Sequence, residues 1–244
     1  MGVLNSGLIS LIMGALNIDG GTKLYAVTFG LALLAMLISY LLGSLSSAII
    51  VSKALYKEDI RTHGSGNAGL TNMLRTYGKK AAALTLVGDM LKTALAIGLT
   101  ATIFGFSYSG GISLSGFCYL SGLWAVMGHV YPVFYGFKGG KGVLVTATMA
   151  LILTPAVFAV LLTIFILIVV ITRYVSLGSI IVASLFPVFV CLYSYFIGGA
   201  APVLTVICTL VLAIFVIWCH RTNIERLKNG TEKKISVGKK EKNS

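Results

Sequence analysis

The segment RTHGSGNAGLTNMLR concentrates glycines and hydrogen-bonding side chains between two arginines. Glycine-rich backbone lets successive N–H groups point into one concavity, which favours an anion such as phosphate. Ser65 and Asn67 add hydrogen-bond donors, and the forked guanidinium of Arg75 pairs well with phosphate. The segment therefore predicts a phosphate-binding loop shaped by Gly64 and Gly66. A flexible loop with helix caps is the alternative.

Three further segments carry related groups. The KGGKG segment combines Lys141 with the glycines Gly139, Gly140 and Gly142. Ser176 lies in RYVSLGS, and the segment HRTNIERL contains His220 and Asn223. Each segment also has a purely structural explanation: a tight turn bearing lysines, a helix cap, or an interfacial anchor. The spacing alone leaves both readings open.

Two charged side chains lie inside an apolar stretch. Asp89 and Lys92 are three residues apart, so they share one face of a helix. They form either a self-neutralising pair that orders a helix bundle or a functional pair, since ionisable residues at membrane depth are usually functional. His129 precedes the KGGKG segment, and we expect it to make a structural hydrogen bond near that loop.

The composition predicts that these groups are carried by membrane helices. Hydrophobic residues make up 57% of the 244 residues and charged residues only 11%, and the mean hydropathy is +0.95. A hydrocarbon core of about 30 Å takes roughly 20 apolar helical residues to cross. Four uncharged runs exceed that length: 24–52, 93–137, 142–172 and 174–219. The predicted fold class is an all-α, polytopic membrane protein, and an ordinary soluble domain is excluded.

Seven transmembrane helices are predicted. They lie within 24–51, at about 81–104, 114–135, 178–197 and 202–219, and as two short spans between 143 and 172. Pro155 would break a single helix through that last region. Two crossings there also place Arg173 on the same side as Lys138 and Lys141, in keeping with the excess of basic residues in cytoplasmic loops. The amino terminus is then outside and the carboxyl terminus cytoplasmic, in the cell membrane.

Three parts of the chain are distinguished by composition. Residues 1–23 form an amino-terminal extension with an apolar stretch too short to span, either an interfacial helix or a loose extension. Residues 24–220 form the membrane domain. Residues 221–244 form a basic tail, whose end GTEKKISVGKKEKNS we expect to be disordered, either solvated or attracted to anionic lipid. The formal net charge of +12 lies in loops and this tail, so it does not indicate nucleic-acid binding.

Metal or cofactor chemistry is not indicated. The four cysteines fall in apolar segments, without the spacing of a metal site or a disulfide framework. We therefore expect neither a metal nor a cofactor. The four polar segments instead meet on one predicted membrane face, which suits a phosphate-bearing substrate reached from the cytoplasm. The neighbouring apolar spans would hold a lipid chain.

Four strings, in this order, resemble the bacterial acyl-phosphate-dependent glycerol-3-phosphate acyltransferase family: DIRTHGSGNAGLTNMLRTYGKK, GHVYPVFYGFKGGKG, RYVSLGS and HRTNIERLKNGTE. The similarity runs from about Tyr40 to Glu232. Departures occur at Ala48 and Thr93, where the family commonly has glycine, and at Leu70, where it has a small residue. These departures affect helix packing and remove no polar candidate.

The resemblance implies a seven-helix integral membrane enzyme. The family transfers a fatty acyl group from acyl phosphate to the 1-hydroxyl of glycerol 3-phosphate, giving lysophosphatidic acid and inorganic phosphate. The implied partners are these two substrates and membrane lipid, and the oligomeric state stays open. Carried over motif by motif, the family's active-site positions are Ser65, Arg75, Lys141, Ser176, His220 and Asn223. The glycines of GSGN and GGKG belong to its phosphate-binding loops.

The mechanism expected from this resemblance relies on positioning and on charge stabilisation, because acyl phosphate is already an activated mixed anhydride. Lys141, Arg75 and the loop N–H groups would hold phosphates. The other polar groups would orient glycerol and the reacting atoms: Ser65, Ser176, His220 and Asn223. The proton acceptor is either His220 or a substrate phosphate oxygen. The phosphate is favoured, since nothing near His220 in the sequence orients its ring.

Two other classes of protein fit parts of the pattern. A carrier for a phosphorylated metabolite would share the basic vestibule and the Asp89–Lys92 pair, although no inverted internal repeat is visible. A purely structural membrane protein would leave the clustered glycines and hydroxyls unexplained. Release of phosphate that depends on both substrates would separate an enzyme from a carrier.

Overall fold

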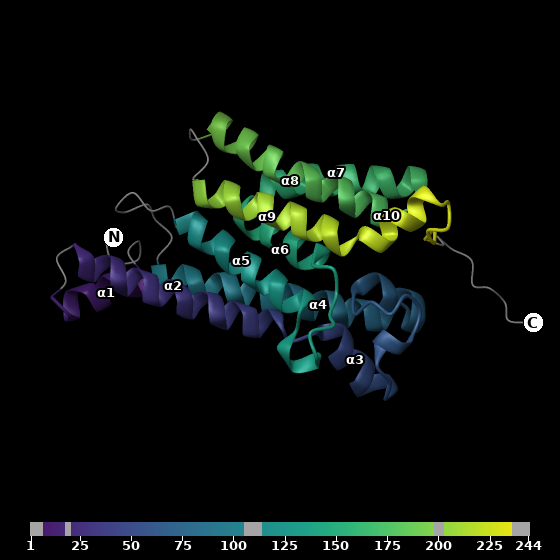
Figure 1. Cartoon of the computed structure of the whole chain (residues 1–244), viewed down its shortest axis with the longest axis horizontal. Helices are drawn as coiled ribbons and strands as arrows, with labels where there is room; N and C mark the ends of the chain where they lie inside the picture. The colour runs from purple at the N-terminus through teal and green to yellow at the C-terminus, as the bar shows by residue number, and fades with distance from the viewer. Residues whose placement is uncertain (1–6, 18–20, 105–113, 198–202, 236–244) are drawn as a thin grey trace, which may run out of the picture.

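A computed structural model of the chain describes residues 7–17, 21–104, 114–197 and 203–235, and these residues form helices and loops without a strand. The elements in order are α1 (Gly7–Ala15), α2 (Thr22–Gly43), α3 (Ser47–Tyr56), the 3-10 turn η1 (Ile60–Thr62), α4 (Leu70–Phe104), α5 (Leu114–Val130), the 3-10 turn η2 (Val133–Tyr135), α6 (Val143–Leu153), α7 (Pro155–Thr172), α8 (Val175–Ile197), α9 (Val203–Cys219) and α10 (Arg221–Lys228). The long helices run side by side along the longest axis (Figure 1). The predicted all-α class is confirmed.

Helix length distinguishes the candidate membrane spans. Five described helical stretches are long and apolar enough to cross a membrane, and α9 with α10 makes a sixth if this pair, bent by 56°, counts as one span. Helix α6 has 11 residues, so it is only about 16 Å long, well short of a hydrocarbon core. Helices therefore lie at all seven predicted spans, but only five or six of them are long and apolar enough to cross a membrane.

Two breaks in the helices have clear local causes. Helix α7 begins with Pro155, a position where the missing proline N–H costs no helical hydrogen bond. The predicted break at this proline is confirmed. Helix α4 begins at Leu70, before the expected start near residue 81, and is kinked at Gly78, whose φ of 81° favours glycine. Part of the segment predicted as a polar loop is thus the first turns of α4.

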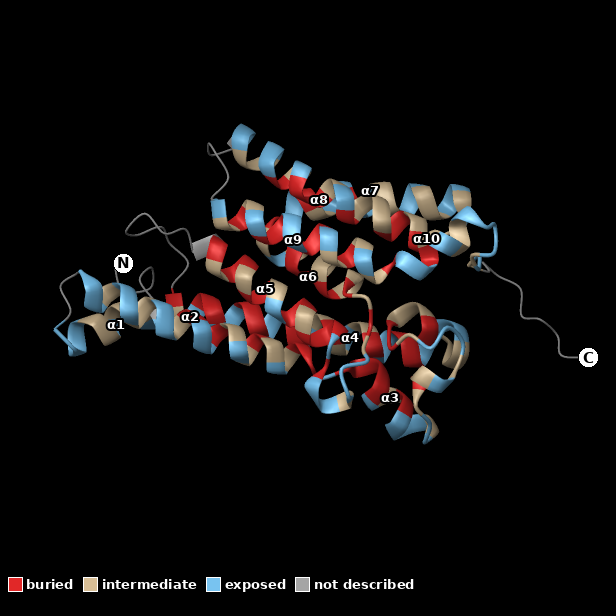
Figure 2. Ribbon diagram, viewed as in Figure 1, coloured by how far each residue is buried: buried red, intermediate tan, exposed pale blue. Residues whose placement is uncertain are grey.

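Helices α2 and α5 pack closely because glycines face backbone at their contact. A Cβ added to Gly43 would lie 2.1 Å from the carbonyl oxygen of Ala125, and one added to Gly128 would lie 2.1 Å from the carbonyl oxygen of Tyr40. Small residues of this kind let helix backbones approach in membrane bundles. The outer surface is apolar as well: Val170 and Ile171 of α7 are 71% and 79% exposed, as expected for lipid-facing positions. Figure 2 shows such exposed stretches along the outer helices.

The polar segments gather at one end of the bundle. Helix α3, the start of α4 and α10 lie at that end, opposite α1, which packs against α4 (Figure 1). We call residues 63–69, between η1 and α4, the first loop, and residues 136–142, between η2 and α6, the second loop. A small apolar cluster that includes Ile49, Ile60, Ala68 and Met73 lies beneath the first loop. It anchors the loop to α3 and α4 separately from the main core.

The predicted tail is ordered further than expected. Helix α10 covers Arg221–Lys228, and the backbone N–H of Ile235 donates to the carbonyl oxygen of Arg173 at 2.8 Å. The expectation of disorder from Gly230 is therefore wrong for residues 230–235, because this segment turns back and bonds to the bundle. Residues 236–244, and residues 1–6 and 18–20 of the predicted extension, lie outside the described residues.

Candidate active site

A cavity of about 720 Å³ opens among the polar segments and runs between α4, α6, α7 and α8. Nine of the twelve predicted site residues line it: Gly64, Ser65, Asn67, Arg75, Lys141, Gly142, Ser176, His220 and Asn223. The three others, Gly66, Gly139 and Gly140, do not lie on its wall. We call the end lined by Ser65, Arg75, Lys141, Asn223 and Glu232 the polar mouth.

The first loop is organised by Asn72, which lies in the first turn of α4 and is 2% exposed. Its Nδ2 donates to the carbonyl oxygens of Ile60, His63 and Asn67 at 3.0–3.3 Å. Its Oδ1 accepts from the backbone N–H of Ser65 at 3.0 Å. A single buried amide therefore fixes the loop that carries Ser65 and Asn67. The sequence analysis missed it, although an asparagine after a glycine-rich loop was a usable signal.

The loop N–H groups expected to face a phosphate are paired within the protein. Besides Ser65, the N–H of Gly66 donates to the carbonyl oxygen of His63 at 2.9 Å. In the second loop, the N–H groups of Gly139 and Gly140 donate to the carbonyl oxygens of Val130 and His129 at 3.0 and 3.1 Å. Buried backbone donors require such partners. These four N–H groups are therefore not available to form the expected anion nest.

A chain of hydrogen bonds crosses the polar mouth. The ammonium of Lys141 donates to Oδ1 of Asn223, and Nδ2 of Asn223 donates to Oε1 of Glu232 at 2.7 Å. The other oxygen of Glu232 accepts from Nε of Arg226 at 2.7 Å. The residues come from the second loop, from α10 and from the segment after it. Sequence reasoning missed Glu232, because it lies in a basic segment that composition alone predicts to be disordered.

The pKa values of Lys141 and Glu232 in this chain are both lowered, for different reasons. The pKa of Lys141 is lowered, chiefly because burial disfavours its charged form and also because Arg226 repels it. Burial acts to raise the pKa of Glu232, but the hydrogen bonds from Arg226 and Asn223 outweigh it and hold the pKa below its ordinary value. The Ser176 hydroxyl also contributes to the lowering of the Glu232 pKa, although the two side chains do not form a hydrogen bond of ordinary geometry. Glu232 is therefore a carboxylate at neutral pH and fixes the Asn223 amide.

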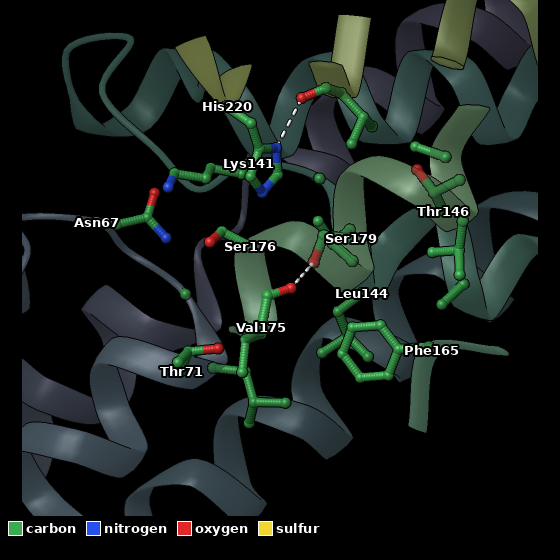
Figure 3. A pocket seen from close by; sticks show the side chains of 18 of the residues that line it. Asn67, Thr71, Lys141, Leu144, Thr146, Phe165, Val175, Ser176, Ser179 and His220 are labelled. Carbon is green, nitrogen blue, oxygen red and sulfur yellow. Dashed lines mark hydrogen bonds between the residues drawn. The ribbon is translucent and has the colours of Figure 1, made fainter. Parts of the chain in front are cut away.

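Two groups at the mouth lack an ordinary hydrogen bond or ion pair among the described residues. Ser176, near the start of α8, is 7% exposed, and its buried Oγ makes no hydrogen bond of ordinary geometry there. In Figure 3 its oxygen points toward the space beside Lys141 and Asn67. Arg75 is exposed and forms no ion pair within the described ranges. A buried unpaired hydroxyl costs about 1–3 kcal/mol, so a polar ligand would relieve that cost.

His220 is oriented by the backbone of its own helix. Its Nδ1 lies 2.7 Å from the carbonyl oxygen of Val216, one turn earlier, so Nδ1 carries the proton and Nε2 is the free acceptor. Figure 3 shows that second nitrogen turned toward the cavity. The expectation that nothing nearby orients the ring is therefore wrong. Burial lowers the pKa of His220 to about 4, and Lys141 contributes to the lowering.

Beyond the mouth the cavity wall becomes apolar. Leu144 and Phe165 lie beside the mouth in Figure 3, and the wall continues deeper along Phe158, Leu161 and Phe186. Cations and free polar groups at one end and hydrocarbon at the other match an amphipathic ligand with an anionic head. The arrangement can hold a phosphate beside a reacting group while an alkyl chain is buried.

Comparison with known proteins identifies the family. A profile of the family described as Glycerol-3-phosphate acyltransferase matches residues 33–230. The chain belongs to this family. Relatives described as glycerol-3-phosphate acyltransferases from Salinibacter ruber and Syntrophomonas wolfei are 42% and 45% identical to it over 208 and 201 residues. The matches cover 82% of this chain in both cases, and 91% and 95% of the two relatives.

Solved structures of the family have the same fold. The chain superimposes with a TM-score of 0.72 and 34% identity on the crystal structure of PlsY (YgiH), an integral membrane glycerol 3-phosphate acyltransferase, in its glycerol 3-phosphate form. That match covers 84% of this chain and 96% of PlsY. The lysophosphatidic acid form matches with a TM-score of 0.70. The chain is thus an integral membrane acyltransferase of the PlsY type, which excludes the carrier and the purely structural readings.

Proposed function

We propose that the protein transfers a fatty acyl group from acyl phosphate to the 1-hydroxyl of glycerol 3-phosphate, the first acylation step of phospholipid synthesis. The products are lysophosphatidic acid and inorganic phosphate. The hydroxyl oxygen attacks the acyl carbonyl carbon, an ester C–O bond forms, and the C–O bond to phosphate breaks. Phosphate leaves with the electron pair, and the hydroxyl proton passes to a phosphate oxygen.

The observation that carries the proposal is the two-ended cavity. The same cavity is lined by Lys141, by Arg75, whose guanidinium forms no ion pair in the described ranges, and by Ser176, whose hydroxyl has no ordinary hydrogen bond there. These are groups that bind phosphate and stabilise charge on a departing phosphate. The apolar end accepts the acyl chain. Of the remaining polar groups, Ser65, Asn223 and His220 orient the glycerol moiety and the reacting carbonyl.

The substrate phosphate is the better proton acceptor. His220 has a free Nε2, but a pKa of about 4 makes it a weak base. A phosphate monoester has its second pKa near 6 and reaches the reacting hydroxyl from within the substrate itself. His220 then accepts at Nε2 a hydrogen bond that orients the hydroxyl, without taking its proton. If so, His220→Gln lowers turnover without creating a new limb in the pH–rate profile between pH 5 and 8.

We propose further that the membrane domain crosses seven times, with the mouth cytoplasmic and the amino terminus outside. The loops bearing Lys138, Arg173 and α10 lie at one end, so α6 and α7 together leave that end and return to it, as two crossings do. Basic residues favour the cytoplasmic side of the cell membrane. In a background with the four native cysteines replaced by alanine, Lys57→Cys and Asn229→Cys should each react with an impermeant maleimide only from the cytoplasmic side. Labelling from outside intact cells contradicts this orientation.

The deciding experiment measures phosphate release by the purified protein in detergent. It receives palmitoyl phosphate with and without glycerol 3-phosphate, beside a palmitoyl-CoA reaction and the Lys141→Ala variant. We expect release that requires both substrates, one lysophosphatidic acid formed per phosphate, and loss of at least about 100-fold in the variant. That loss corresponds to about 2.7 kcal/mol, typical for a charged hydrogen bond.

Each other outcome changes the conclusion. Activity with palmitoyl-CoA alone keeps the acyl transfer but overturns the proposed donor. Phosphate release without lysophosphatidic acid means hydrolysis instead of transfer. Full activity of Lys141→Ala would remove the polar mouth from the mechanism. Folding of each sample is checked by its elution from a sizing column and by its thermal unfolding midpoint.

A further inference from the structure

Three residues outside the polar mouth form one buried cluster. The ammonium of Lys92 lies 2.8 Å from Oδ1 of Asp89, 2.9 Å from the carbonyl oxygen of Leu45 and 3.0 Å from Nδ1 of His129. Lys92, Asp89 and His129 are 4%, 1% and 4% exposed. The hydroxyl of Ser47 donates to the same carboxylate oxygen at 2.9 Å. The cluster therefore joins the turn between α2 and α3 to α3, α4 and α5.

The hydrogen-bond inventory fixes the state of the His129 ring. An ammonium has three N–H donors, and Lys92 has three acceptors around it, so it donates to Nδ1 of His129. The proton of the neutral ring then sits on Nε2, on the side away from Lys92. The ring is thus oriented by one hydrogen bond, from an ammonium that Asp89 and the carbonyl oxygen of Leu45 hold in place.

The far edge of that ring lies against the second glycine loop. A Cβ added to Gly140 would lie 2.1 Å from Nε2 of His129 and 2.9 Å from the carbonyl oxygen of Ala68, which belongs to the first loop. The carbonyl oxygen of His129 also accepts the N–H of Gly140 at 3.1 Å. Gly140 is therefore enclosed by His129 and the first loop, and the next residue is Lys141. Asp89 and His129 line the same cavity as Lys141.

We propose that His129, held by Lys92 and Asp89, is a positioning residue. Its ring supports the backbone of the Gly139–Lys141 loop and thereby determines where the Lys141 ammonium lies in the mouth. The cluster acts through the loop backbone and touches no reacting atom. This assignment rests on the proposed acyl transfer and adds to it a role for three side chains that the transfer chemistry leaves unused.

Stability alone is a weak explanation for the cluster. A buried ion pair often contributes little net stability, because desolvation of the two charges offsets their attraction. An apolar cluster would hold α3, α4 and α5 together as well. An apolar cluster would not hold an imidazole in one rotamer under Gly140, because a hydrogen bond to the ring determines its orientation.

The test uses two replacements that separate the two sides of the ring. His129→Asn keeps an amide oxygen near the Nδ1 position, so Lys92 retains an acceptor, but it leaves the space beneath Gly140 empty. His129→Gln extends toward Gly140 but displaces the acceptor from Lys92. The matched control is Ser39→Ala, which breaks another buried polar contact between α2 and α5, the 2.8 Å bond from Ser39 to Ser121, far from either loop in the sequence.

We expect His129→Asn to raise the KM for glycerol 3-phosphate about 10-fold while kcat changes less than about 3-fold. Glycerol 3-phosphate has only polar contacts, so it is more sensitive to a displaced Lys141 than acyl phosphate, whose chain is also bound. His129→Gln should raise that KM less, and Ser39→Ala should leave it unchanged. The unfolding midpoints of His129→Asn and Ser39→Ala should fall by similar amounts. A KM within 2-fold of wild type in His129→Asn overturns the proposal.

A double variant guards against loss of fold as the cause. Gly140→Ala should weaken glycerol 3-phosphate binding strongly because its Cβ would collide with His129. In the His129→Asn background, the added Cβ enters space that the imidazole has left. The double variant should therefore weaken glycerol 3-phosphate binding by less than the product of the two single effects. Strict additivity overturns the proposal. If the wild-type protein itself forms no lysophosphatidic acid, the acyl transfer fails instead, which keeps the two failures distinct.

Discussion

The polar mouth and the buried cluster contain similar groups but use them differently. In the cluster around Lys92, the three ammonium donors are matched by acceptors at 2.8, 2.9 and 3.0 Å. At the mouth, Arg75 has no ion-pair partner and Ser176 no ordinary hydrogen bond within the described part of the chain. Fully paired polar groups rigidify, whereas unpaired ones await a ligand. The contrast separates groups that position from groups that bind.

The chain from Lys141 to Arg226 lies between these two extremes. Lys141 faces the cavity, but its partner Asn223 is held by Glu232, which is held in turn by Arg226. All four residues line the cavity, and we expect Lys141 to contact the substrate while Glu232 and Arg226 hold Asn223 in place. This gradient predicts that replacing a residue costs mainly activity at the mouth, both activity and stability in the middle, and mainly substrate affinity or stability at the cluster.

Arg75→Ala should have the largest effect on activity alone. An unpaired guanidinium that meets a phosphate contributes about 1.5–3 kcal/mol, so we expect kcat/KM to fall about 100-fold. The thermal unfolding midpoint should stay within about 1 °C of wild type, because no ion pair or side-chain hydrogen bond between described residues is lost. Arg75→Lys should recover only part of the activity, since an ammonium cannot pair bidentately. A drop in stability as large as the drop in activity would show that Arg75 has a structural partner.

Glu232→Gln should damage activity and stability together. The amide cannot accept both the Asn223 and Arg226 hydrogen bonds as a carboxylate does, and Arg226 loses its 2.7 Å ion pair. We expect kcat/KM to fall about 10- to 30-fold and the midpoint to fall by several degrees. Steady-state kinetics and thermal unfolding of the same preparation measure both. Arg226→Gln is the matched control: it breaks only the outer bond, and it should cost less activity than Glu232→Gln.

The sequence could predict which segments carry the site residues but not which contacts position them. Long uncharged runs and Pro155 predicted the helices and the α6–α7 break, because hydrophobicity and the missing proline N–H act locally. Assigning all the basic loops to one membrane face predicted that the four polar segments lie close together, and the structure confirms that they line one cavity. Asn72 and Glu232 were missed because their roles depend on backbone groups and side chains that only the folded chain brings near them.

The glycines illustrate the same limit. A glycine-rich loop is compatible with N–H groups that face an anion and with backbone that must approach another element. The sequence cannot distinguish these cases. At Gly64, whose φ is +62°, an added Cβ would lie 2.2 Å from Oδ1 of Asn72, and at Gly140 it would strike His129. Close approach to another element explains the glycine at both positions.

Ser176→Ala should be milder than either change above. The substitution removes one buried hydroxyl that has no ordinary hydrogen bond in the described structure, so the free protein loses only its weak interaction with Glu232. We expect kcat/KM to fall about 5- to 10-fold and the unfolding midpoint to stay level or rise slightly. Ser179→Ala serves as the comparison, because its hydroxyl already donates to the carbonyl oxygen of Val175 at 2.9 Å. Ser179→Ala should change activity less than 2-fold.

The smallest effect concerns pH and stability at His220. Its folded pKa of about 4 lies below the ordinary value of 6.5, so the unfolded chain binds more protons between these values. The stability from the neutral, buried ring is therefore complete above pH 6.5 and is lost as pH falls toward 4. In thermal unfolding, the midpoint of wild type should drop more between pH 7 and pH 4.5 than that of His220→Gln.

Other carboxylates and histidines titrate equally in both proteins, so the difference between the two curves isolates His220. A difference that stays constant with pH would mean that the ring is solvated or already charged at neutral pH. It could then not offer a free Nε2 to the substrate. In that event His220 would join Lys141 and Arg75 among the cations of the mouth, and the substrate hydroxyl would have to be oriented by Ser65 or Asn223 instead.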